Sequence, residues 1–265
     1  MPTDPAALLT DLAAETAELR DLIDPLPEAA WRHATPAPGW TIGDQIGHLA
    51  YFDDVAVTAA TDPPAFAALQ ASHAAAAENP DTIAARYRAL GPSELLDWFG
   101  GARARLLEAF AGLDRSVRVP WFGPPMGVPS MITARLMETW AHGQDIADTV
   151  GARREPTARL RHVAHLGVIA RSYSYAAHGL PAPGEPVRVE LTAPSGELWT
   201  WGPPEAPDRI TGAAVDFCLL VTQRRHRTDT SVIAHGSAAE QWLSIAQAFA
   251  GPPGPGRIPG QFSAS

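Results

Sequence analysis

Glu138 and His142 are the two residues whose types and spacing most directly predict chemistry. They stand four positions apart in residues 130–150, where apolar side chains recur at helical intervals and Gly151 follows the last of them. We therefore expect one amphipathic helix that ends at this glycine. Residues at i and i+4 share a helix face, so a carboxylate oxygen and an imidazole nitrogen can approach the same ion. The pair predicts half of a metal site.

His48 offers the second half. Thr41 and Asp44 are spaced as in a capping box, which predicts a helix that begins after Thr41 and carries His48 among apolar neighbours. Two imidazoles and one carboxylate would leave one coordination position open, which is typical of catalytic rather than structural zinc sites. Taken singly, each histidine is more often an ordinary core or surface residue, so the combination carries the prediction.

Two runs of sequence carry a family resemblance, WTIGDQIGHL at residues 40–49 and ETWAHGQD at residues 138–145. Together they resemble the DinB-like metalloproteins, and within them the actinobacterial branch that contains mycothiol-dependent maleylpyruvate isomerase. QRRH at residues 223–226 and HGSAAEQW at residues 235–242 extend the resemblance over nearly the whole chain.

The resemblance implies a four-helix bundle that holds a divalent metal, commonly Zn²⁺, with Ni²⁺, Fe²⁺ or Mn²⁺ as alternatives. In the family the ligands are one histidine on the second helix and a Glu-x-x-x-His pair on the last. The matching positions here are His48, Glu138 and His142.

The expected fold class is mainly α with a smaller α+β part. Residues 1–180 are expected to form the DinB-like bundle, and a change of composition at residues 180–186 indicates a linker. Residues 186–250 are expected to form a small α+β domain, which the resemblance likens to a sterol-carrier-protein fold. Residues 251–265 are expected to be a flexible tail.

Several elements of the second half can be predicted individually. One helix is expected from about residue 156 to 177. The pattern then favours a strand hairpin at residues 187–191 and 197–201, a helix at residues 212–221 and a strand at residues 231–235. Ser237 and Glu240 have the spacing of a capping box for a last helix through Phe249.

The overall composition excludes some classes of function. The 265 residues are 46% hydrophobic and 18% charged, as in a soluble globular protein of two domains. The formal net charge is −9 and the basic residues cluster only at 224–227, which argues against a nucleic-acid partner. No run of 18 apolar residues and no signal-like start is found, so we expect a cytoplasmic protein without a membrane partner. The family resemblance implies a monomer or a homodimer.

The coordination position that the three ligands leave open predicts activation of a bound water or thiol. A metal ion there would lower the pKa of a bound water or thiol and give hydroxide or thiolate near neutral pH. The resemblance implies that the thiol is mycothiol, a low-molecular-weight thiol that attacks an electrophilic carbon. Cys218, the single cysteine, excludes an internal disulfide and lies between apolar residues, so we expect a buried, inert thiol there.

Further residues are candidates for the site. Asp145 follows His142 by three positions and could accept its second imidazole N–H, and Asp44 could do the same for His48, although a helix cap is the more common use of such a residue. Arg224 and Arg225 could bind a carboxylate of mycothiol or of the substrate, or could be a solvated surface pair.

A stiff, proline-rich loop at residues 119–129 precedes the helix with Glu138. Trp121, Phe122 and Met126 could face the substrate from this loop, or the loop could simply be clamped to the bundle surface.

The leading hypothesis is a mycothiol-dependent metalloenzyme, an S-transferase or isomerase, that acts on a small electrophilic and carboxylated substrate. One alternative is a thiol-independent metalloenzyme, either a hydrolase or a Lewis-acid isomerase or cyclase in a biosynthetic pathway. The other is a protein that binds a metal and an apolar ligand without catalysis.

Overall fold

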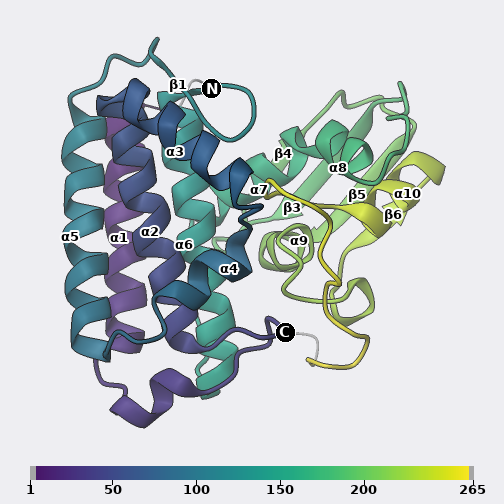
Figure 1. The fold of residues 1–265 in the computed structure, drawn as a ribbon. Coiled ribbons are helices and arrows are strands. Elements are labelled where there is room, and N and C mark those ends of the chain that lie inside the picture. Colours follow the sequence, from purple (N-terminus) through teal and green to yellow (C-terminus); the bar gives the residue numbers. More distant parts are fainter. Residues whose placement is uncertain (1–3, 263–265) are drawn as a thin grey trace. The chain divides into compact units, whose positions relative to one another are not determined.

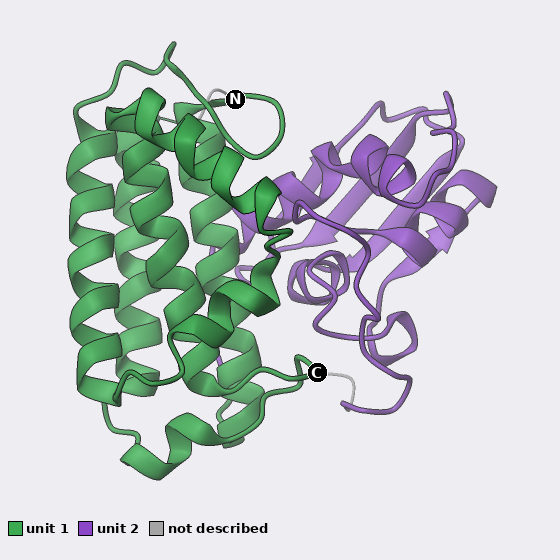
Figure 2. Ribbon diagram, viewed as in Figure 1, with its two compact units in different colours: residues 1–153 green, residues 154–265 purple. Residues whose placement is uncertain are grey.

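The computed structural model describes residues 4–262 and divides into two compact units, residues 1–153 and 154–265 (Figure 2). This boundary precedes the predicted linker at residues 180–186. The reason is that helix α7 (Leu160–Ile169) packs on α9 (Ala214–Val221), and α8 (Arg171–Ala177) packs on α10 (Ser237–Ile245), all within the second unit. None of the helices within residues 4–262 is long and apolar enough to cross a membrane.

The first unit is a bundle of four long helices (Figure 1). Helix α2 (Ile42–Thr61) packs against α5 (Pro92–Ala111) and against α6 (Val128–Val150). Helix α1 (Pro5–Ile23) packs against the same two helices. The short elements of the unit are η1 (Glu28–Arg32), α3 (Pro63–Ala75), α4 (Pro80–Arg86), β1 (Arg118–Val119) and β2 (Met126–Gly127).

Local sequence signals account for the ends of these helices. Thr41 and Asp44 form the predicted capping box of α2, since the Thr41 hydroxyl accepts from the Asp44 amide while the Asp44 carboxylate accepts from the Thr41 amide. Gly151 ends α6 in the left-handed region, with φ of 69°, where a residue with a Cβ would be strained. Apolar side chains of α2, α5 and α6 then fill one core, including Ile46, Phe99 and Ile146.

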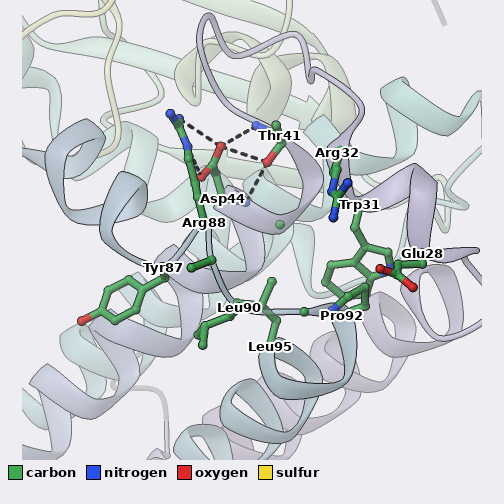
Figure 3. A pocket seen from close by; sticks show the side chains of 13 residues that line it. Glu28, Trp31, Arg32, Thr41, Asp44, Tyr87, Arg88, Leu90, Pro92 and Leu95 are labelled. Carbon is green, nitrogen blue, oxygen red and sulfur yellow. Dashed lines mark hydrogen bonds and ion pairs between the residues drawn. The ribbon is translucent and has the colours of Figure 1, made fainter.

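A pocket of about 460 Å³ opens beside the start of α2 (Figure 3). Its walls come from η1, from the first residues of α2 and from the connection between α4 and α5, with Trp31 and Leu95 as apolar lining. Arg88 spans one side, where its guanidinium donates to both carboxylate oxygens of Asp44 at 2.9 and 3.1 Å. None of the three predicted metal ligands lines this pocket.

The second unit is built on a sheet with strand order β4-β3-β5-β6. Strands β3 (Val187–Thr192) and β4 (Leu198–Trp201) form the predicted antiparallel hairpin, and β6 (Ile233–His235) lies within the predicted last strand. Strand β5 (Asp208–Ala213) was absent from the prediction, which began a helix at residue 212 instead. It lies between β3 and β6, parallel to β3, and α9 follows it directly.

Two helix predictions in this unit are corrected by the structure. The single helix expected at residues 156–177 is divided into α7 and α8 at Ala170. The last helix, α10, starts at Ser237 but ends at Ile245, and the Ser237 side chain makes no cap bond. The Asp208 carboxylate caps it instead, accepting from the Ala239 amide at 2.9 Å.

The C-terminal tail differs from the flexible segment that the sequence predicts. The Gly260 amide donates to both carboxylate oxygens of Asp229 at 2.8 and 3.0 Å, and the Gly251 amide donates to the Tyr173 hydroxyl at 2.7 Å. Arg257 is buried. Residues 251–262 are therefore fastened to the second unit, and residues 263–265 lie outside the described residues.

Candidate metal centre

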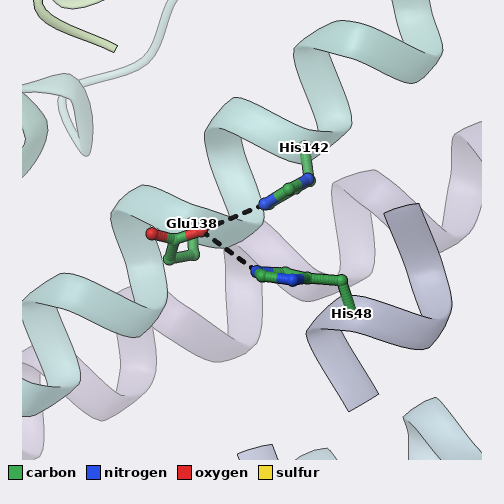
Figure 4. A group of neighbouring side chains, drawn as sticks. All are labelled: His48, Glu138 and His142. Carbon is green, nitrogen blue, oxygen red and sulfur yellow. Dashed lines mark hydrogen bonds and ion pairs between the residues drawn. The ribbon is translucent and has the colours of Figure 1, made fainter. Parts of the chain in front are cut away.

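His48, Glu138 and His142 meet inside the first unit (Figure 4). The Oε2 atom of Glu138 lies 3.0 Å from Nε2 of His142 and 3.5 Å from Nε2 of His48. One donor atom from each residue lies within 4.8 Å of the other two. Helix α2 thus supplies the first histidine, and the i, i+4 spacing on α6 supplies the other two residues. The structure thus brings the three predicted ligands together.

Burial and mutual contacts set the charge states of this trio. Burial, together with the nearby His142, lowers the pKa of His48 to about 4. Burial alone would raise the pKa of Glu138, but its hydrogen bonds with His142 and His48 hold that pKa well below its usual range. At neutral pH His48 is therefore neutral and Glu138 is ionised. These are the forms in which the two side chains ligate metals.

Gln45 orients His142. The Thr35 hydroxyl donates to the Trp40 carbonyl at 3.0 Å, so its oxygen accepts from the side-chain amide of Gln45 at 2.9 Å. The Oε1 atom of Gln45 is then left to accept from Nδ1 of His142, with which it makes a short contact. This chain of hydrogen bonds orients the ring so that Nε2 lies on the side where the three donor atoms meet.

The structure confirms the favoured role of Asp44 as a helix cap and gives His142 a different partner from Asp145. Nδ1 of His142 contacts Gln45 and Nε2 contacts Glu138, and Asp145 is buried on the same helix. Asp44 serves as the helix cap and as the ion partner of Arg88. Gln45 escaped sequence reasoning because an amide neither titrates nor ligates metals commonly. The one feature of the sequence that could have indicated its role is its position three residues before His48, which puts both residues on neighbouring turns of the same helix.

Aromatic rings surround the trio. Trp40 lies 5.3 Å from the ring of His48 and 5.8 Å from that of His142, measured between centroids, and Phe52 lies 4.6 Å from His48. Such apolar neighbours lower the local dielectric and strengthen the electrostatic interactions within the site.

The proline-rich loop joins this aromatic group through Phe52. The Phe52 ring is 6.3 Å from Trp121 and 6.2 Å from Phe122. Gln70 on α3 donates to the Trp121 carbonyl at 2.8 Å, and Met126 pairs with Val119 in the short β1–β2 ladder. The loop is therefore clamped to α2 and α3, and two of its three candidate residues are linked to the metal-ligand trio through one ring.

The remaining candidates lie in the second unit. The amides of Arg224 and Arg225 both donate to the Leu219 carbonyl, at 2.7 and 3.2 Å, in the turn that ends α9. The Arg225 guanidinium lies 3.9 Å from the ring centroid of Phe262. Cys218 is buried in α9 as predicted, and burial raises the pKa of its thiol far above the ordinary value.

Comparison with known proteins identifies the family. The family model of the mycothiol maleylpyruvate isomerase N-terminal domain matches residues 12–147, just over half of the chain. The chain belongs to this family. The metal-ligand trio thus lies within the part that the mycothiol maleylpyruvate isomerase N-terminal domain model covers. A second family model, described as Wyosine base formation, matches residues 183–235.

Relatives and solved structures agree with this assignment. The Mycobacterium tuberculosis proteins MT0041 and Rv0036c, from two strains and both described as uncharacterized, are each 51% identical over 258 residues, covering 96% of this chain and 99% of their own. Crystal structures of the mycothiol-dependent maleylpyruvate isomerase and of a histidine-to-alanine mutant of it match with a TM-score of 0.60 and 18% identity. Each match covers 88% of this chain and 93% of the other. This likeness confirms the predicted fold class, a DinB-like helical bundle followed by a smaller α+β part.

Proposed function

We propose that this protein is a metal-dependent enzyme that uses mycothiol to isomerise a small electrophilic substrate. The observation that carries the proposal is the convergence of His48, Glu138 and His142 within 4.8 Å, in a chain of the mycothiol maleylpyruvate isomerase N-terminal domain family. Two solved structures of the same fold, from a mycothiol-dependent maleylpyruvate isomerase, support the choice of thiol and reaction.

The residues present fit a divalent metal. Two imidazoles and one carboxylate are a common donor set for catalytic Zn²⁺, and the low pKa of His48 keeps this side chain neutral at neutral pH, with one ring nitrogen available to bind a metal. A metal bound by this set supplies a Lewis acid that lowers the pKa of a thiol in the remaining coordination position. Gln45 orients the His142 ring for binding, while Trp40 and Phe52 supply apolar walls beside the two imidazoles.

The thiol of this reaction comes from outside the chain. Cys218 is the single cysteine, it is buried, and its Sγ donates to the Leu160 carbonyl at 3.4 Å. Its raised pKa keeps it in the unreactive thiol form. A low-molecular-weight thiol therefore has to enter the site, and the cytoplasm is the compartment in which such a thiol stays reduced.

We assign roles to the other candidates within this proposal. Arg224 and Arg225 bind a carboxylate of mycothiol or of the substrate, for which the planar guanidinium is well suited. Trp121, Phe122 and Met126 form the apolar side of the substrate site. The linkage of Trp121 and Phe122 to His48 through Phe52 supports this role.

Turnover with maleylpyruvate tests the proposal first. The purified protein, analysed for bound metal, is incubated with maleylpyruvate in the presence and absence of mycothiol, and the substrate is followed by its absorption. Isomerisation that requires both the metal and mycothiol supports the proposal. Metal-dependent conversion without the thiol would contradict it and favour a hydrolase or a Lewis-acid isomerase or cyclase. Transfer of the thiol to a substrate carbon without release would instead identify an S-transferase.

A further inference from the structure

A buried network of charged residues lies beside the metal-ligand trio. Asp53 on α2 is completely buried, and Arg103 on α5 and Arg135 on α6 are each 3% exposed. The Nε atom of Arg103 donates to Oδ2 of Asp53 at 2.7 Å, and Nε of Arg135 donates to Oδ1 at 2.9 Å. One carboxylate is thus shared between two guanidinium groups in the centre of the bundle.

The network joins all four long helices. Arg103 donates to the hydroxyl of Thr16 on α1 and, at 3.0 Å, to the hydroxyl of Thr139 on α6. The Nη2 atom of Arg135 donates to the carbonyl of Leu49 at 3.2 Å. Leu49 directly follows His48 in α2.

The position of this network along the helices links it to the site. Arg135 precedes Glu138 by three residues on α6, so its bond to the Leu49 carbonyl ties the backbone next to one ligand to the helix that carries the other two. On the other side of His48, Gln45 contacts His142. Helix α2 is thereby fastened to α6 both before and after His48.

A buried ion network such as this one is not expected to add much to the stability of the fold. Burying charged groups requires the loss of their hydration, and well-packed apolar replacements of buried ion networks are often neutral or stabilising. The attested benefit of buried polar groups is to specify one register between helices. The charged groups of this network lose their hydration, yet they connect all four long helices. The network therefore fits a role in fixing the register between helices.

We propose that Asp53, Arg103 and Arg135 are positioning residues that hold α2 and α6 in the register at which His48 meets Glu138 and His142. The metal centre is then formed in advance of metal binding. This inference rests on the proposed function for its metal, but the register can be measured separately in protein from which the metal has been removed. The distance between the ring centroids of His48 and His142, 4.4 Å, is a direct measure of the register between α2 and α6.

The decisive variant replaces the whole network by apolar side chains, Asp53→Leu/Arg103→Met/Arg135→Met. We expect it to keep its helical circular dichroism, while loss of the Arg103 charge near the buried Glu15 should lower its thermal unfolding temperature. Its Zn²⁺ dissociation constant, measured by chelator competition, should rise about tenfold or more, as is typical when groups that orient metal ligands are lost. In the metal-free variant the nuclear Overhauser effects between the two histidine rings should weaken.

A neighbouring ion pair provides the matched control. Arg105 donates to Asp54 at 2.7 Å, one residue along α2 from Asp53, but both side chains are substantially exposed. Arg105→Gln should leave metal affinity and the histidine contacts unchanged. Arg135→Lys is the milder test if the triple variant does not fold, because lysine keeps the charge but cannot bond Asp53 and the Leu49 carbonyl with one planar group.

The outcomes separate the two proposals. A folded triple variant, or a folded Arg135→Lys variant, with parental Zn²⁺ affinity and parental His48–His142 contacts would overturn the positioning role. A parent protein that keeps these histidine contacts but binds no metal would contradict the proposed function, while loss of the contacts in the variants would still support the positioning role.

Discussion

Oε1 of Gln45 contacts Nδ1 of His142 across the packed faces of α2 and α6, and this contact fixes which nitrogen of the imidazole faces Glu138. The amide itself is held by the Thr35 hydroxyl at 2.9 Å. One of the candidate metal ligands is therefore held by an uncharged residue that lies outside the Glu-x-x-x-His motif.

Gln45→Leu tests this dependence. The change removes the acceptor and leaves a buried Nδ1–H without a partner, so Zn²⁺ affinity should fall about 10- to 100-fold. Gln45→Glu, which restores an acceptor, should bind Zn²⁺ more tightly than Gln45→Leu. The control is Gln144→Leu, because Gln144 lies on α6 but donates to Asp148 at 2.8 Å. Parental affinity in Gln45→Leu would show that the contact does not orient the ligand.

The pKa of His48 predicts how acid affects the metal-free protein. Its folded-state pKa is about 4, below the ordinary 6.5, so between these values the unfolded chain binds the extra proton. Stability should fall as the pH drops from 6.5 to 4, by roughly 3 kcal/mol in total for this group. Glu138 acts in the same direction at lower pH, because its pKa is also lowered. Urea unfolding of the parent and of His48→Gln at several pH values measures the effect, and equal pH slopes would contradict it.

Cys218 should not react in the folded protein. It is buried and its pKa is raised, so a thiol-specific reagent should modify it only after denaturation. Cys218→Ala should retain mycothiol-dependent turnover and lose about 1 kcal/mol of stability, a common effect of a point substitution. Rapid labelling of the native protein, or loss of turnover with an intact fold, would show that the thiol takes part in the reaction.

The two arginines after α9 should affect ligand binding more than folding. Arg224→Ala and Arg225→Ala should each weaken mycothiol or substrate binding about tenfold or more, since a hydrogen bond to a charged group is worth roughly 1.5–3 kcal/mol. Lysine at the same positions should restore only part of the affinity, because it keeps the charge without the planar fork. Calorimetric titration gives the constants. If both alanine variants bind like the parent, neither arginine holds the carboxylate.

Local sequence patterns predicted the three candidate ligands, and the structure brings their donor atoms together. The i, i+4 pair and the capping box at Thr41 each depend on residues within one helix, so the short-range pattern determines which face carries the ligands. The meeting of the two halves required the packing of α2 on α6, which only the family resemblance indicated. Gln45 was missed because its role arises from contacts across that packing.

The second unit was harder to predict for the same physical reason. Strand β5 has the sequence DRITGA, which contains a glycine and only a weak apolar alternation, and its parallel partner β3 lies far back in the chain. The tail resembled a flexible segment in composition, yet Asp229 accepts two bonds from the Gly260 amide. Both features depend on long-range pairing that leaves little trace in local sequence.

A mycothiol titration of the Co²⁺-substituted protein tests the central claim most directly. With His48, Glu138 and His142 as ligands, saturating mycothiol should produce a sulfur-to-cobalt charge-transfer band at one thiol per protein. His142→Ala, which should keep most of its helical circular dichroism, should lose both the bound metal and the band. A metal-loaded parent that shows no such band would contradict thiol activation at this centre, and a His142→Ala variant with parental metal content would contradict the site itself.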